Sequence, residues 1–239
     1  MNKWGKLCFL ILGGGTIFKL SSMKDVFYVP MQQDWGLSNT QIGFGFTIYA
    51  IIQTIGLFSS LYIADRFSKK ILLPAGLIGV GLCGAYLSTL PPFTGYLIAF
   101  GAMAFFGEVV YWPVLLKSVR LLGNKEEQGR MFGFLEAGRG VVDVLVASGA
   151  LYIFVLFGEG KAGMQAGLIY YTLATIIVGI ITYFIVDNDD KKETSSASEA
   201  NRQVLEGIKN VVKCPNLWLA SMSIFFVYSA YCGLTYFIP

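Results

Sequence analysis

Residues 71–90 read ILLPAGLIGVGLCGAYLSTL, twenty positions without one charged side chain. An α-helix of that length spans about 30 Å, which is the thickness of the hydrocarbon core of a bilayer. Lipid offers the backbone no hydrogen-bond partners, so a single segment that crosses it must pair its own peptide groups as a helix. The stretch therefore predicts a transmembrane helix.

Comparable apolar segments recur along the chain. Seven helices are expected, over residues 7–28, 41–63, 71–90, 96–119, 131–157, 164–186 and 217–238. Charged residues make up 14% of the 239 positions, whereas a soluble domain carries about 25%. The alternating segments of about 10 residues that a membrane β-barrel requires do not occur in the sequence. The expected fold class is an all-α membrane protein, and the first apolar run, which has no cleavage site after it, is retained.

Basic residues gather in alternate connections between these segments. They are Lys3, Lys6, Arg66, Lys69, Lys70, Arg120, Lys125, Arg130, Lys191, Lys192, Arg202, Lys209 and Lys213. An excess of lysine and arginine marks the cytoplasmic side of a membrane. We therefore expect a multi-pass protein of the inner or plasma membrane with a cytoplasmic N-terminus.

The polar stretch 187–216 divides the chain. Residues 1–186 form a predicted six-helix bundle, 187–216 a cytoplasmic linker, and 217–239 the seventh helix. The first part of the linker is charged and serine-rich, whereas its apolar positions from 204 to 212 recur at helical spacing. That pattern predicts a short amphipathic helix on the membrane surface, or alternatively a solvated helical linker. Six helices, a linker and a new helix are half of a twelve-helix arrangement, so we expect the sequence to be a fragment.

Several kinds of catalytic site are excluded by residue type. The sequence contains no histidine, and its four cysteines are widely separated without a C-x-x-C pair. No G-x-S-x-G motif and no acidic pair at metal-binding spacing occurs either. We therefore expect no enzyme activity, no metal and no cofactor.

Charged residues inside the expected helices are the strongest functional signal. They are Lys19, Lys24, Glu108, Glu136, Arg139 and Asp143. Each costs about 2.5–3.5 kcal/mol at the bilayer centre, so these groups must pair with one another or face water or a ligand. Glu136, Arg139 and Asp143 are spaced by three and four residues and should share one helix face.

Two interpretations of these charges remain open. In the first, Lys19, placed about twelve residues into the first helix and without a local partner other than Asp25, meets an anionic substrate in a central cavity. Glu108 would then be a proton-coupling carboxylate. In the second, Arg139 is neutralised by Glu136 or Asp143, and Glu108 pairs with Lys19 or Arg139. The residues predicted to bind substrate are Lys19, Lys24, Tyr49, Gln53, Tyr111 and Arg139; those predicted to couple protons or pair charges are Glu108, Glu136 and Asp143.

Glycines predict close helix contacts. Gly76, Gly79, Gly81 and Gly84, and Gly133 with Ala137, should let backbones approach each other. The run Gly13–Gly14–Gly15 should soften the first helix.

The connection at 64–70, ADRFSKK, resembles the loop signature of the major facilitator superfamily. Asp65, Arg66 and Lys70 match it and are the expected gating loop, whereas Leu61 and Ser68 replace glycines that the signature usually contains. The resemblance implies a fold of two six-helix halves, of which this chain holds the first and the start of helix seven.

A narrower resemblance is to the organophosphate–phosphate antiporter branch, which includes glycerol-3-phosphate transporters. It rests on Asp65-Arg66 followed by LPAGL at 73–77, on GLS at 36–38, and on Trp112-Pro113. Ser22 stands where that branch has a phosphate-binding arginine, and Arg139 near its histidine.

The resemblance implies a secondary active transporter that moves a small organic anion, a sugar phosphate or sugar acid, by alternating access. Phosphate or a proton would be the coupling species. A non-transporting, receptor-like or accessory membrane protein is the alternative.

Overall fold

The computed structural model describes residues 2–186 and 214–237. The chain divides into two compact units, Met1–Asp190 and Lys191–Pro239, and each is treated by itself. Every regular element within the described residues is helical. The amphipathic helix expected at 204–212 lies outside them.

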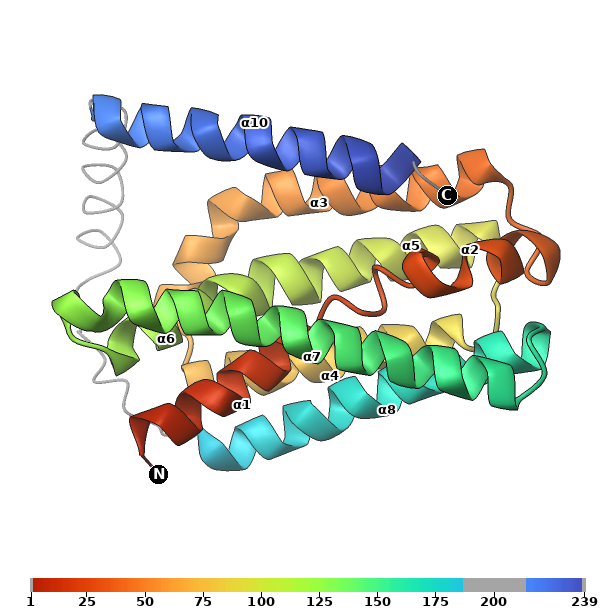
Figure 1. The fold of residues 1–239 in the computed structure, drawn as a ribbon, viewed down its shortest axis with the longest axis horizontal. Helices are drawn as coiled ribbons and strands as arrows, with labels where there is room; N and C mark the ends of the chain where they lie inside the picture. Colours follow the sequence, from red (N-terminus) through yellow and green to blue (C-terminus); the bar gives the residue numbers. More distant parts are fainter. Residues whose placement is uncertain (1, 187–213, 238–239) are drawn as a thin grey trace. The chain divides into compact units, whose positions relative to one another are not determined.

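After the first apolar segment, the helices of the first unit follow the apolar segments closely. They are α1 Lys3–Thr16, α2 Lys24–Gln33, α3 Asn39–Arg66, α4 Lys69–Leu87, α5 Phe93–Ala104, the π-helix η1 Phe105–Tyr111, α6 Trp112–Leu122, the 3₁₀ turn η2 Lys125–Glu127, α7 Gln128–Leu156 and α8 Lys161–Ile185 (Figure 1). The second unit contains α10, Pro215–Phe237. Five of the described helical stretches are long and apolar enough to cross a membrane. The predicted all-α membrane fold is confirmed.

The first unit is a bundle in which α1 lies against α7 and α4 lies against α8 (Figure 1). The helix formed by α5, η1 and α6 packs against α3 on one side and α4 on the other. α1 contacts α6, α7 and α8. These contacts position the charged residues that are described in the next subsection.

The expected continuous helix over 7–28 is wrong. α1 ends at Thr16, residues 17–23 form turns, and α2 begins only at Lys24. The hydroxyl of Thr16 donates to the carbonyls of Leu12 and Gly13, and Ser21 donates to Phe18. Such side-chain hydrogen bonds compete with the helical pattern and bend helices. Lys19 consequently lies in a break, not in the middle of a helix.

The segment expected at 96–119 is continuous but changes its winding. Between Phe105 and Tyr111 it is π-helical, and Pro113 follows in the first turn of α6. Proline has no N–H and its ring crowds the carbonyl four residues earlier, here that of Val109. A local π-helix accommodates this, and such segments are frequent at functional sites. Glu108 lies in its centre.

Glycines bring α1 and α4 against the aromatic residues of η1. A Cβ added at Gly76 would lie 2.6 Å from Cβ of Tyr111 and 3.0 Å from the carbonyl oxygen of Phe106. A Cβ at Gly13 would overlap the Tyr111 hydroxyl, so this tyrosine lies between two glycine surfaces. The run at 13–15 thus serves close packing. Gly133 does not, because a Cβ there meets no described atom within 4 Å.

Gly76→Ala should lower the free energy of unfolding, because neither the Tyr111 Cβ nor the Phe106 carbonyl is the flexible end of a side chain. Overpacking of this kind costs about 1–3 kcal/mol. Gly133→Ala is the matched control, and alanine's better helix propensity should leave stability equal or slightly higher. The thermal unfolding midpoints of both variants of the 239-residue chain in detergent test this; equal midpoints would contradict it.

Candidate functional site

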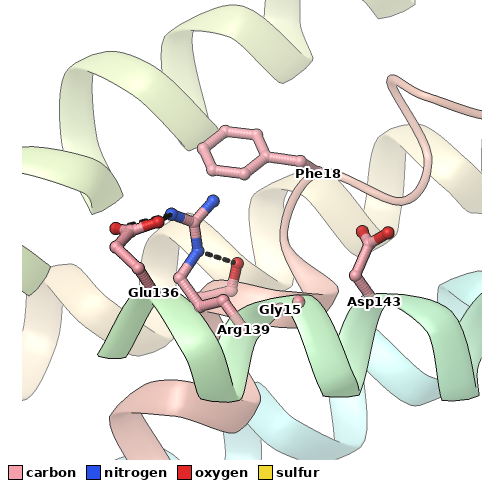
Figure 2. Close-up of a pocket in the computed structure, with 7 residues that line it drawn as sticks. Gly15, Phe18, Glu136, Arg139 and Asp143 are labelled. Carbon is pink, nitrogen blue, oxygen red and sulfur yellow. Dashed lines mark hydrogen bonds and ion pairs between the residues drawn. The ribbon is translucent and has the colours of Figure 1, made fainter. Parts of the chain in front are cut away.

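A pocket of about 200 Å³ opens between α1 and α7 (Figure 2). Its lining residues come from α1, from the break after it and from one face of α7: Gly14, Gly15, Phe18, Glu136, Arg139, Gly140 and Asp143. Glu136, Arg139 and Asp143 thus lie on one face of α7, as their spacing of three and four residues predicts. Because two of the lining residues on α1 are glycines, the Arg139 side chain lies directly against the α1 backbone.

Arg139 is held by hydrogen bonds from two directions. Its Nε donates to the carbonyl oxygen of Gly14 at 3.1 Å, and its Nη1 donates to both carboxylate oxygens of Glu136 at 3.0 and 2.8 Å (Figure 2). A carboxylate paired with a guanidinium makes a strong, charge-assisted contact. The pairing of Arg139 within its own helix, one of the two options left open by the sequence, is present here.

Lys19 pairs with a residue that its position in the sequence does not suggest. Its Nζ lies 2.5 Å from Oδ1 of Asp143 on α7, so its counter-ion comes from another helix and not from Asp25, the acidic residue near it in the sequence. The Lys19 residue is 5% exposed, whereas half of the Asp143 side chain is exposed. Asp143 lines the pocket and Lys19 does not. The Asp143 carboxylate therefore lies between the pocket and the buried Lys19 ammonium.

Glu108 belongs to a second polar cluster. Its Oε1 accepts a hydrogen bond from the Tyr49 hydroxyl at 3.2 Å, and the Gln53 side chain also hydrogen-bonds this carboxyl. Tyr49 and Gln53 lie one turn apart on α3. The structure thus brings three predicted site residues together, but none of them lines the pocket. Lys19 and Arg139 make their ion pairs with Asp143 and Glu136, not with Glu108. Arg139 acts on the Glu108 carboxyl only as a nearby charge.

Two predicted binding residues lie elsewhere. Lys24 on α2 pairs with Asp25 at 3.4 Å and lies over the Phe46 ring at 5.8 Å. Tyr111 is only 1% exposed, because it fills the space between α1 and α4. The structure brings neither residue to the pocket lining.

The expected gating loop joins α3 to α4. Arg66 ends α3, and Lys70 lies over the Tyr183 ring of α8 at 5.4 Å. The Ser68 hydroxyl accepts a hydrogen bond from the Lys70 N–H and caps α4. The side chain of Asp65 lies outside the described part of the chain.

Sequence reasoning missed Phe18 as a pocket residue. An aromatic residue inside an apolar run carries no signal that separates it from lipid-facing or core residues. The break that turns Phe18 toward α7 is equally hidden, since Thr16 and Ser21 are common within membrane helices.

Comparison with known proteins identifies the family to which the chain belongs. Residues 10–239 match the Major Facilitator Superfamily. Inner membrane protein YihN of Escherichia coli K12 is 44% identical over 241 residues, covering 100% of this chain and 57% of that protein. Inner membrane protein YqcE of the same organism is 29% identical over 236 residues, covering 98% of this chain and 56% of that protein. The chain thus spans little more than half the length of these relatives. No solved structure matches.

The Lys19–Asp143 pair should respond asymmetrically to mutation. Asp143→Asn leaves a buried ammonium without its counter-ion and should cost on the order of 1–3 kcal/mol, below the value for fully buried pairs because Asp143 is half exposed. Lys19→Met leaves only a half-solvated carboxylate and should cost less. The double variant should resemble Lys19→Met.

Thermal unfolding of the three variants measures this order. Lys3→Met is the control, because its pair with Glu127 at 2.7 Å is more than a third exposed on both sides, and such pairs contribute about 0–1 kcal/mol. A larger loss for Lys19→Met than for Asp143→Asn would contradict the proposed burial of the lysine.

Proposed function

Because the chain belongs to the major facilitator superfamily of membrane transporters, we propose that it is the N-terminal half of a secondary active transporter for a small organic anion. The substrate class, a sugar phosphate or a sugar acid, is supported by the resemblance to the organophosphate–phosphate antiporters. Alternating access would require the remaining length found in its relatives. A receptor-like protein without transport is the alternative, and measurement of flux separates the two.

The observation that carries the proposal is the orientation of Arg139. A guanidinium has five N–H donors. Gly14 and Glu136 use those on Nε and Nη1. Nη2 makes no hydrogen bond with any residue that the structure describes, and Figure 2 shows it pointing away from Glu136, on the side of Phe18. A planar cation with one open edge beside a pocket is suited to bind a carboxylate or phosphate oxygen.

The coupling proposal rests on the charges around the pocket. Lys19 is balanced by Asp143, and Arg139 by Glu136. An anion that enters this neutral arrangement adds a negative charge beside two carboxylates that already balance the two cations, which is unfavourable. A proton on Asp143 would remove that charge and release Lys19 to the anion. We therefore favour proton symport over exchange for phosphate.

Other groups near Asp143 enter the same balance. Asp143 and Asp25 of α2 both act electrostatically on Tyr171 of α8. Glu108, hydrogen-bonded to Tyr49, remains a proposed second proton-binding carboxyl.

We also propose a cytoplasmic N-terminus, which is supported by the basic residues of the α3–α4 and α6–α7 connections. The α3–α4 connection is the proposed gating loop. Reaction of a cysteine placed at position 125 with an impermeant maleimide added outside intact cells would contradict this orientation.

Arg139→Gln should reduce anion uptake by roughly tenfold or more, as expected for loss of a charge-assisted hydrogen bond. Lys19→Gln should reduce uptake to a similar extent. Lys161 is an exposed lysine at the start of α8, and Lys161→Gln should leave uptake unchanged. The measurement is uptake of labelled glucose 6-phosphate and gluconate by proteoliposomes containing the protein at the full length of its relatives. Membrane insertion is checked by the yield of folded protein. Normal uptake by both Arg139→Gln and Lys19→Gln would refute the assignment.

Asp143→Asn should separate binding from coupling. In the unmodified protein, acidification outside the vesicle should accelerate uptake. In the variant, anion binding should persist because Lys19 keeps its charge, but the pH gradient should no longer drive accumulation. Uptake that requires internal phosphate and ignores the pH gradient in the unmodified protein would instead support exchange.

A further inference from the structure

Two aromatic rings from different elements surround the Arg139 guanidinium. Its central carbon lies 4.5 Å from the centroid of the Trp112 ring and 5.8 Å from that of Phe18. The two rings meet edge to face, with centroids 5.7 Å apart and planes at 63°. Phe18 belongs to the break after α1, and Trp112 is the first residue of α6. The cation thus lies in an aromatic corner that only the folded bundle forms.

An aromatic face attracts a cation through its quadrupole, and indole is the strongest of the natural rings in this respect. A guanidinium is also planar and stacks on such a face, which restricts its rotation. Trp112 does not line the pocket, but it contacts two residues that do, Arg139 and Phe18. Its effect on a ligand in the pocket would therefore be indirect, and the shorter of these contacts is the one to Arg139.

The stem of Arg139 is confined as well. A Cβ at Gly14 would lie 3.0 Å from Cδ and 3.2 Å from Cγ of Arg139, so a side chain there would require the stem to shift away from α1 by a few tenths of an ångström. The Gly14 carbonyl then accepts the Nε hydrogen, and Glu136 accepts from Nη1. Trp112 lies against the guanidinium as well. Nη2 is then the nitrogen without a hydrogen bond to a described residue, and Figure 2 shows it on the side of Phe18, which lines the pocket.

We propose that Trp112 is a positioning residue for Arg139 and sets the single edge through which the guanidinium meets an oxyanion. This inference rests on the proposed anion-binding function of the pocket. It names a residue that touches no ligand and adds a geometric requirement: the anion bonds to Nη2 and leaves the contacts of Nε and Nη1 intact.

The chain contains a matched control for the same chemistry. Arg130 lies over the Trp4 ring at 5.2 Å and over Phe134 at 5.5 Å, and these two rings also meet edge to face. None of these three residues lines the pocket. A substitution of Trp4 removes a cation–π contact of the same kind without touching the proposed site.

Transport kinetics test the positioning role at the full length of the relatives. Trp112→Leu should raise the apparent KM for the transported anion by about two- to thirtyfold, the range expected for loss of a cation–π contact, with little change in maximal rate. Trp112→Phe should fall between, and Trp4→Leu should match the unmodified protein. An unchanged KM in Trp112→Leu, with uptake lost in Arg139→Gln, would overturn the positioning role while leaving the proposed function intact.

Fluorescence of the 239-residue chain in detergent tests the contact without transport. Replacement of Trp4, Trp35 and Trp218 by phenylalanine leaves Trp112 as the only indole. Arg139→Gln should then change the Trp112 emission in the absence of any ligand, and Arg139→Lys should largely restore it. An emission unaffected by Arg139→Gln overturns the inference.

Titration with inorganic phosphate separates the two proposals. A phosphate-dependent change in Trp112 emission that disappears in Arg139→Gln supports both. An emission that responds to Arg139→Gln but not to phosphate supports the contact and counts against anion binding in this pocket.

Discussion

The cost of placing charge in a poorly solvated environment governs the arrangement of this bundle. Two cations and two carboxylates meet along the contact between α1 and α7, and each cation has a carboxylate partner. In lipid an unpaired charge would be expelled or neutralised. These pairs therefore constrain where the first segment can break and which face of α7 turns inward. The glycines of α1 at this contact leave room for the paired side chains. The pocket is the space that remains beside these pairs.

Irregular backbone accompanies charge at both polar clusters. Lys19 lies in the turns between α1 and α2, and Glu108 lies in the π-helix η1. Non-helical backbone at membrane depth is tolerated where protein or a water-filled cavity surrounds it. Transporters built from broken helices use such segments to bind substrates and ions. These two irregular segments thus coincide with the two candidate polar sites.

The clusters are linked through one short stretch of chain. Glu108 and Trp112 lie four residues apart. Glu108 is hydrogen-bonded to Tyr49 of α3, and the Arg139 guanidinium of α7 lies over the Trp112 ring. Tyr111 between them is clasped by glycines of α1 and α4. A change in the winding of η1 would therefore move a carboxyl and the support of the pocket arginine together. This geometry connects the proposed proton-binding carboxyl with the proposed anion-binding arginine within one helical bundle.

The sequence alone determined the features that depend on local composition and helical period. Apolar length predicted helices, of which five described stretches are long and apolar enough to cross a membrane. Spacings of three and four predicted that Glu136, Arg139 and Asp143 share a face. The tertiary structure alone decided that Lys19 pairs with Asp143, that Tyr111 is buried between Gly13 and Gly76, and that Phe18 and Trp112 enclose Arg139. These contacts join residues far apart in the chain. Hydropathy predicts that a helix lies in the membrane. It does not predict which helix packs against it there, because lipid and protein interiors are equally apolar.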